Sequence, residues 1–289
     1  MDKDLLNRMK SIRQTVQISG AQKLVAASQI GKARKMLEES EPYHSRIIHA
    51  IANMLQQCPE LVKHYDEADF KGSKKKRGLL VFAANHGLAG SFNSNIVHFT
   101  KEYMEEKPVS YIIVLGQACR NHLIQEGYPV DKEYFQPLDP PSMFTARELA
   151  EKIMDMIESG KVDAFNIIYT HYKSSVRMDP MCERLYPINY TQFVKTDDVS
   201  EKPYFEPSPQ KVLESMVIKY IKGFIYGCLV DTWRCELTSR VTAMDNAIRN
   251  GNEMLDKLSL LYNRARQASI TQEITEIVAG AAALMESDD

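Results

Sequence analysis

The chain has 289 residues, of which 44% are hydrophobic, and a formal net charge of −2 at pH 7. This length and composition suffice to bury the core of one large domain or two smaller ones, and they exclude an intrinsically disordered chain. Binding of nucleic acid requires a clustered basic face, and the nearly balanced charge gives no general reason to expect one. Partners must therefore be inferred from local features of the sequence.

No part of the sequence has the character of a targeting or membrane-spanning segment. Residues Met1 to Arg8 interleave acidic residues with leucines and lack the basic and apolar regions of a signal peptide. The apolar stretch from Ile277 to Met285 is shorter than the roughly 20 residues that a membrane-spanning helix requires. We therefore expect no secretion, and we expect any association with a membrane to be indirect.

The cysteines are odd in number and show no CxxC spacing, which favours reduced thiols in a cytosolic protein over a disulfide framework. Cys228 and Cys235 are seven residues apart and would share a helix face, but no histidine or acidic residue completes a metal-ligand set there. The sequence therefore predicts no metal site. The five cysteines are Cys58, Cys119, Cys182, Cys228 and Cys235.

The first segment reads as one long helix from Asp4 to about Gln57, bent at its only proline, Pro42. Its apolar residues follow the 4-3-4 steps of a coiled-coil seam, weaken around Ser19 and Lys23, and then resume. The seam residues are Leu5, Met9, Ile12 and Val16, followed by Ala27, Ile30 and Leu37.

From Gly78 to Pro203, short apolar runs alternate with amphipathic stretches, which is typical of an open α/β sheet. We expect strands at 79–84, 111–115, 165–172 and 184–188. We expect helices at 93–105, 117–125 and 145–158, the last opening after Ser142. This segment is predicted to be a compact domain inserted between two long helices.

Ser208 and Pro209 form a good N-cap and first helical position, and no proline follows. A single helix of about 75 residues would be roughly 110 Å long, so it needs a partner. Its apolar residues keep a period near 3.5, which predicts a left-handed supercoil. They are Leu237, Val241, Met244, Ile248, Gly251, Leu255, Leu258, Tyr262 and Ala265, then, after a phase shift, Ile270, Ile274, Ile277, Ala281 and Leu284.

The N-terminal helix is the obvious partner, and it would run antiparallel to the C-terminal one. Residues 1–40 carry eight Lys or Arg and four Asp or Glu, whereas residues 236–289 carry five and nine. These opposite charges favour the pairing, although exposed ion pairs support its register more than its strength.

Several short motifs are best interpreted as structural. The run Gly87 to Ser91 lies where phosphate-binding loops occur but matches neither GxGxxG nor GxxxxGK[ST], so we expect a turn. Lys74 to Arg77 is expected to be a solvated loop, although it could meet phosphates. Gly223 and Gly227 form a GxxxG that is expected to pack closely on the sheet domain.

Signals of catalysis are absent from the sequence. The seven histidines are scattered, and neither HExxH nor a GxSxG elbow occurs. Glu273 and Glu276 lie three apart on a helix and are more simply surface carboxylates than an acid/base pair. We therefore predict no catalytic, cofactor-binding or metal-binding residues and no cofactor.

The run from Leu258 to Ala281 closely resembles the signature of the F-type ATP synthase gamma subunit. Residues 18–27, Pro42-Tyr43 and 87–93 also resemble counterparts in that family, as do Glu236, Arg240, Ala243, Met244, Ala247 and Asn250, so the resemblance spans the chain. Departures from the usual family residues mark a divergent member; they are Gly20, Gln22, Asn85, His86, Ala89 and Ser91.

The resemblance implies a fold with a long antiparallel coiled coil and a central open-sheet, Rossmann-like α/β domain. From the patterns along the chain we expect the coiled coil at 1–60 and 208–289 and the α/β domain at 75–205. The coiled coil would turn inside a hexamer of alpha and beta subunits, with the α/β domain on the membrane c-ring beside epsilon. Nucleotide chemistry would belong to the beta subunits, and the complex would lie on the cytoplasmic face of the bacterial plasma membrane.

The resemblance also implies polar contacts with a beta subunit through Gln267, Thr271 and Glu273, with Lys23 and Arg240 near the same coupling region. Two alternatives remain at this point. The chain could be a non-rotary coiled-coil scaffold with the same fold, or an enzyme that binds a nucleotide in its α/β domain, against which the missing phosphate motif argues. The coupling ion and the direction of rotation are properties of the wider complex.

Overall fold

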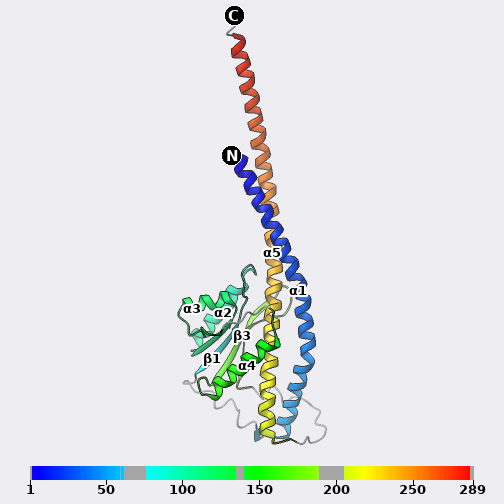
Figure 1. Cartoon of the computed structure of the whole chain (residues 1–289), viewed down its shortest axis with the longest axis vertical. Coiled ribbons are helices and arrows are strands. Elements are labelled where there is room, and N and C mark those ends of the chain that lie inside the picture. Colours follow the sequence, from blue (N-terminus) through cyan, green and yellow to red (C-terminus); the bar gives the residue numbers. More distant parts are fainter. Residues whose placement is uncertain (1, 59, 62–75, 135–139, 189–204, 287–289) are drawn as a thin grey trace. The chain divides into compact units, whose positions relative to one another are not determined.

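The computed structural model describes residues 2–58, 60–61, 76–134, 140–188 and 205–286. Two compact units are distinguished: unit 1 combines Met1–Val25 with Val241–Asp289, and unit 2 is Ala26–Arg240. The elements in chain order (Figure 1) are α1 (Asp2–Gln57), β1 (Arg77–Phe82), α2 (Phe92–Glu106), β2 (Tyr111–Leu115), α3 (Gln117–Gln125), α4 (Met143–Glu158), β3 (Ala164–Tyr172), β4 (Met178–Tyr186) and α5 (Pro209–Glu286).

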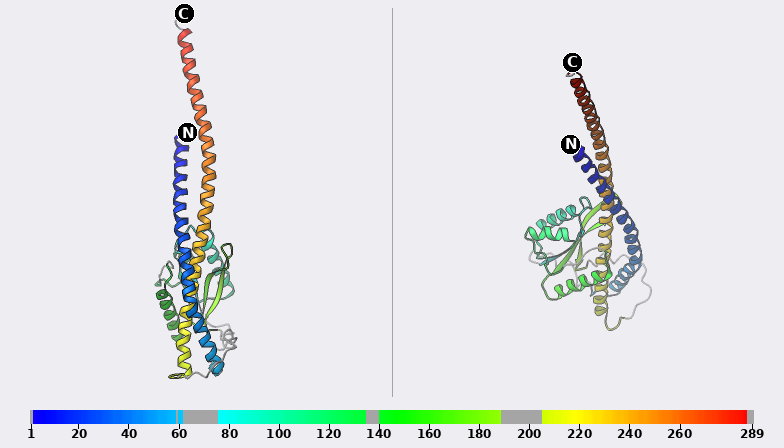
Figure 2. Two further views of the ribbon diagram at one scale, coloured as in Figure 1. Left: turned by 90° about the vertical axis from the view of Figure 1, so that its right-hand side faces the viewer. Right: turned by 45° about the horizontal axis from the view of Figure 1, so that its top comes forward.

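The two terminal segments are long uninterrupted helices. α1 has 56 residues and continues through Pro42, and α5 has 78 residues. The start of α5 is capped as expected, because the Ser208 hydroxyl accepts a hydrogen bond from the Lys211 N–H at 3.4 Å. The helices lie side by side (Figure 1 and Figure 2), which confirms the predicted helix pair.

Within unit 1, the helix pair uses the predicted seam. Met9 on α1 and Met244 and Leu258 on α5 are buried, while most positions between the seam residues are exposed. A Cβ atom added to Gly251 would lie only 2.5 Å from Cγ2 of Val16, so the backbone of α5 approaches α1 closely here. Only a residue without a side chain fits this crossing without a shift.

Unit 2 holds a four-stranded mixed sheet in the order β2-β1-β3-β4. β1 pairs in parallel with β2 and β3, and β4 pairs antiparallel with β3. The expected open sheet is therefore confirmed, with an antiparallel strand at one edge. α2 and α3 lie on one side of the strands and α4 on the other (Figure 2).

The boundaries of β1 and β4 differ from the expected ones by two residues or more, and β3 begins one residue early. β4 begins at Met178, six residues before the predicted start. The early start was not expected, because a proline such as Pro180 usually argues against a strand. The proline is tolerated since β4 is an edge strand, whose outer side needs no backbone donor. β1 ends at Phe82: the Ala83 N–H still donates to the Leu115 carbonyl of β2, but that of Ala84 donates to Oδ1 of Asn93.

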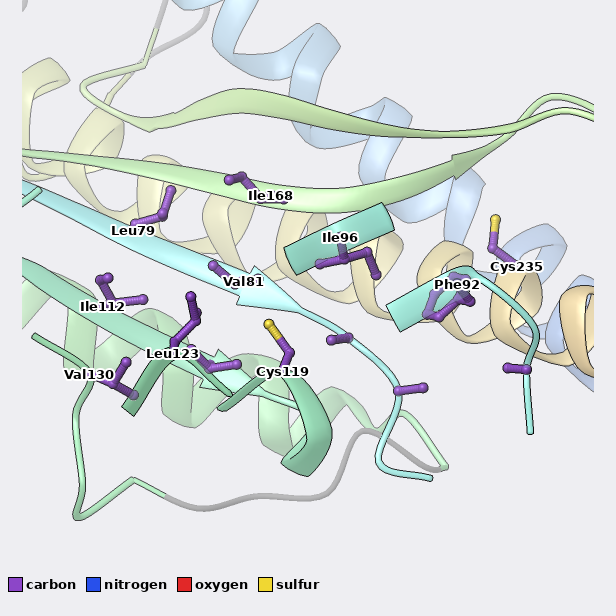
Figure 3. Close-up of a cluster of buried hydrophobic side chains, with 14 residues drawn as sticks. Leu79, Val81, Phe92, Ile96, Ile112, Cys119, Leu123, Val130, Ile168 and Cys235 are labelled. Carbon is purple, nitrogen blue, oxygen red and sulfur yellow. The ribbon is translucent and has the colours of Figure 1, made fainter. Parts of the chain in front are cut away.

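The core of the sheet domain fills both faces of β1, whose residues from Gly78 to Phe82 are all buried. Alternate residues of β1 point to opposite faces, so this burial requires a cover on each side. Figure 3 shows the cluster on the face covered by α2 and α3. It includes Leu79, Val81, Phe92, Ile96, Ile112, Cys119, Leu123, Val130 and Ile168, together with Cys235 from α5.

Of the GxxxG on α5, Gly223 faces α1 and neither glycine faces the sheet, which corrects the expectation. A Cβ atom on Gly223 would lie 2.8 Å from Nδ1 of His44, whereas one on Gly227 would meet nothing within 4 Å. The His44 ring stacks on Tyr220 at a centroid distance of 5.4 Å, and burial lowers its pKa. Gly223 therefore makes room for a ring from α1.

Asp131 links the start of β2 to α4. Its carboxylate accepts hydrogen bonds from the Tyr111 hydroxyl and from the N–H groups of Glu133 and Tyr134, and it lies 2.7 Å from Nζ of Lys152. Burial alone would raise the pKa of Asp131, but the bonds from Lys152, Tyr111 and the backbone outweigh it and lower the pKa to about 2.

We expect this carboxylate to stabilise unit 2 by about 1–2 kcal/mol after allowance for solvent screening. Because the folded pKa is below the ordinary value of 3.8, the contribution is complete above that value and is lost as the pH falls towards 2. Urea unfolding followed by fluorescence of the single tryptophan, the buried Trp233, measures it. The difference between the wild type and Asp131→Asn should shrink between pH 5 and pH 2, and a constant difference would contradict this assignment.

Candidate functional site

The far end of α5 carries three of the predicted contact residues, and all three are exposed. Gln267, Thr271 and Glu273 lie in unit 1 on a stretch of helix whose polar bonds are local. The Thr271 hydroxyl donates to the Gln267 carbonyl at 2.9 Å, one helical turn earlier. Gln267 and Thr271 therefore share a face, whereas Glu273 points away from it. These side chains are available to a partner.

They are exposed because the pairing of the two helices ends before them. Val16 meets Gly251, and Lys23 bonds to Asp245, so the paired residue numbers add to 267 or 268. By the same register Asp2, the first residue of α1, falls opposite residue 265 or 266. α5 continues to Glu286. Its last 20 or so residues thus extend beyond α1.

The unpaired part of α5 comprises residues 266–286, and it presents apolar side chains to solvent between residues 270 and 278. Ile274 is 56% and Ile277 is 71% exposed, and Ile270 and Val278 are exposed as well. The described residues of the second half of the expected seam, Ile270, Ile274 and Ile277, are therefore not buried, because α1 does not reach them. The side chains of Ala281 and Leu284 lie outside the described ones. An apolar stripe of this kind is typical of a surface that another chain covers.

Lys23 forms an ion pair with Asp245 where α1 and α5 run side by side in unit 1. The hydrogen bond from Lys23 lowers the pKa of Asp245. Both side chains are well exposed, so the pair contributes little to stability and mainly favours one register of the helices. This pair joins one residue of the basic N-terminal segment to one residue of the acidic C-terminal segment.

Arg240 lies in unit 2 and serves an internal role. Its Nη2 is 2.6 Å from Oε1 of Glu236, one turn earlier on α5, and 3.3 Å from the carbonyl oxygen of Gly87. The Glu236 side chain is only 2% exposed. Arg240 thus compensates a buried carboxylate and also holds the loop after β1, which is a turn as expected.

The predicted contact residues therefore fall at separate places. Gln267, Thr271 and Glu273 lie within two turns of α5. Lys23 bonds at Asp245, about 33 Å before Gln267 along the helix at 1.5 Å per residue. Asp245 was not predicted as the partner of Lys23. Two signals were available in the sequence: Asp245 lies next to the seam residue Met244, and its charge is opposite to that of Lys23.

Glu273 and Glu276 are both exposed. Lys74 and Lys75 of the basic run lie outside the described residues, and Lys76 is exposed. Among residues that the structure describes, no three His, Cys, Asp or Glu are grouped to hold a metal ion. In the same ranges, no helix has the length and apolar character needed to cross a bilayer.

The chain is similar to known proteins along nearly its whole length. Residues 2–284 match the family model described as ATP synthase. The chain is 40% identical to the ATP synthase gamma chain of Acetivibrio thermocellus over 285 residues, covering 96% of this chain and 97% of the relative. It is 39% identical to that of Ruminiclostridium cellulolyticum, covering 98% of each.

A solved structure shows the same fold at lower identity. It is a chain of the central stalk and c-ring of the mitochondrial ATP synthase of Tetrahymena thermophila, with a TM-score of 0.61 and 21% identity over 80% of this chain and 99% of that one. A long helix pair with an open-sheet domain, matched along nearly its whole length, defines a non-catalytic stalk subunit of a rotary ATP synthase. The chain belongs to the ATP synthase gamma chain family.

Proposed function

We propose that α1 and α5 turn as a shaft inside a hexamer of alpha and beta subunits, and that the sheet domain rests on the c-ring beside an epsilon subunit. The observation that carries this proposal is the unpaired, apolar end of α5, which needs a surrounding partner. The residues from Ile277 to Leu284 carry no charge in the sequence, which suits a part that must turn against its partner.

The mechanism follows from the asymmetry of the helix pair. A rod of two unequal helices presents a different face to each beta subunit as it turns, so each subunit is biased in turn towards a different nucleotide affinity. One charge that crosses the membrane releases about 2.3 kcal/mol per 100 mV, so several ions must contribute to each ATP. The shaft transmits this work, and rotation in the reverse direction would pump ions.

Gln267, Thr271 and Glu273 are proposed to make polar contacts with a beta subunit, since all three are exposed beside the apolar stripe. Lys23 and Arg240 are proposed to contact partners while they keep their bonds to Asp245 and Glu236. We further propose the division into residues 1–60, 75–205 and 208–289. Attachment to the cytoplasmic face of a bacterial plasma membrane would then be peripheral and would pass through the c-ring.

Purification of the tagged chain from its native membranes tests the proposal. The alpha, beta and epsilon subunits and the c-ring should accompany it in fixed ratio. A chain that is stable and abundant but purifies without alpha and beta would contradict the shaft and favour the non-rotary scaffold.

We expect the double substitution Ile274→Ser and Ile277→Ser to leave the free energy of unfolding of the isolated chain within about 0.5 kcal/mol, because both side chains are exposed and serine has a similar helix propensity. In the assembled complex in vesicles, ion pumping per ATP hydrolysed should fall severalfold, since the stripe loses its apolar contact with the partner.

The matched control is Leu258→Ser on the buried seam, which should destabilise the isolated chain. Pumping that is unchanged in the double variant would contradict a function of the stripe in coupling.

A further inference from the structure

Strand β3 is longer than its parallel neighbour. β1 pairs with β3 only as far as Val81 opposite Ile168, whereas β3 continues to Tyr172. On the other edge, β4 stays paired to the end of β3, with Thr170 opposite Pro180 and Tyr172 opposite Met178. The backbone groups of Thr170 and Tyr172 on the β1 side therefore have no strand partner, although Thr170 is buried.

One turn of α5 supplies these missing partners. Oγ1 of Thr232 accepts from the Thr170 N–H at 3.3 Å, and the Cys235 thiol donates to the Thr170 carbonyl at 3.5 Å. Oδ2 of Asp231 accepts from the Tyr172 N–H at 3.2 Å. Three side chains on one helical turn thus replace the absent part of β1, all within unit 2.

Two further contacts surround these bonds. Asp231 lies 2.7 Å from Nδ1 of His171, and the Arg234 guanidinium lies 3.6 Å from the centroid of the Tyr172 ring. Thr232 and Cys235 are fully buried, so water does not compete for their bonds. Burial also raises the pKa of the Cys235 thiol, which keeps it protonated and able to donate.

We propose that these contacts, Asp231, Thr232 and Cys235 against the end of β3, are the point at which torque on α5 passes to the sheet domain. The inference rests on the shaft function proposed above and deepens it. Apolar packing is non-directional, so it opposes separation of a helix from a sheet more than rotation of the helix about its axis. Hydrogen bonds to fixed backbone groups are lost after a small rotation, and they therefore resist it.

The test uses the complete ATP synthase with the alpha and beta subunits fixed to a surface. A probe attached through a biotin-acceptor peptide, inserted at the exposed Gly160–Lys161 turn, reports angular fluctuations of the sheet domain while rotation is paused. Thr232→Val together with Cys235→Ala should increase the angular variance at least about twofold, because the directional bonds to Thr170 are gone. The rate of ATP hydrolysis without load should stay near that of the wild type.

Two controls separate torque transfer from a merely structural effect. Thr232→Ser retains the accepting hydroxyl and should keep the wild-type variance. Cys228→Ala removes another buried thiol of α5 and should lower thermal stability without changing the variance. If the double variant does not assemble, Thr232→Val, which has nearly the same shape as the wild-type residue, carries the comparison with Thr232→Ser.

A variant complex that assembles, rotates and shows the wild-type variance would overturn the torque role of these contacts. An equal rise in the variance of Cys228→Ala would also overturn it. In contrast, failure of the wild-type chain to assemble with alpha and beta subunits would refute the shaft function itself, so the two failures are distinguishable.

Discussion

Replacing Arg240 with alanine is expected to lower the free energy of unfolding by about 3 kcal/mol. The substitution removes the cation that lies 2.6 Å from the buried Glu236 carboxylate, and it also removes the donor to the Gly87 carbonyl. A buried charge that loses its counter-ion costs far more than an exposed one. Urea unfolding of the isolated chain, followed by the fluorescence of Trp233, measures the change.

The exposed ion pair between α1 and α5, Lys23 with Asp245, provides the comparison. Lys23→Ala removes a cation from Asp245, but both side chains are solvated, so the cost should stay below about 1 kcal/mol. Arg240→Lys keeps a charge near Glu236 but loses the planar guanidinium, and an intermediate cost is expected. Equal costs for Arg240→Ala and Lys23→Ala would show that burial of Glu236 does not govern the energetics.

Gly251→Leu should force the paired helices of unit 1 apart and destabilise them by about 1–3 kcal/mol. The first side-chain atom would lie 2.5 Å from Cγ2 of Val16 and 3.8 Å from Cγ2 of Ile12, so a branched side chain finds no room. Alanine is a less decisive substitution, because its higher helix propensity, worth about 1 kcal/mol, opposes the clash. Denaturant unfolding followed by circular dichroism at the helical band reports the loss.

Two variants isolate the steric cause. Asn252→Leu introduces the same side chain at the adjacent exposed position and should be nearly neutral. Val16→Ala combined with Gly251→Leu opens the space opposite the new side chain and should recover at least half of the lost stability. No recovery in the double variant would mean that the crossing at Gly251 is not the source of the cost.

Much of the fold could be predicted from local patterns. The 3.5-residue period from Leu237 to Ala265 gave the seam, and Ser208 and Pro209 gave the start of α5. β2 and α3 have the predicted boundaries, because a short apolar run and the glycine before α3 mark them clearly. The start of β4 could not be predicted, since Pro180 is permitted only by an edge position that the sequence does not reveal.

The site was less predictable, because it depends on contacts between distant segments. The composition indicated opposite charges on the two terminal segments, but not that Lys23 would meet Asp245. The same holds for Arg240, whose bonds to the buried Glu236 and to the Gly87 carbonyl depend on the fold of the sheet domain. The contacts of Asp231 and Thr232 depend on β1 ending before β3, and that difference in strand length has no local signal.

The unpaired end of α5 stays helical because it continues a helix that has already formed. Starting a helix in water is unfavourable, and an isolated helix of this length would be only marginally stable. Residues 266–286 avoid that step, because they propagate turns already formed where α1 supports α5. A proline introduced between Leu258 and Ile270 would cut this segment off from its nucleus and leave it to melt by itself.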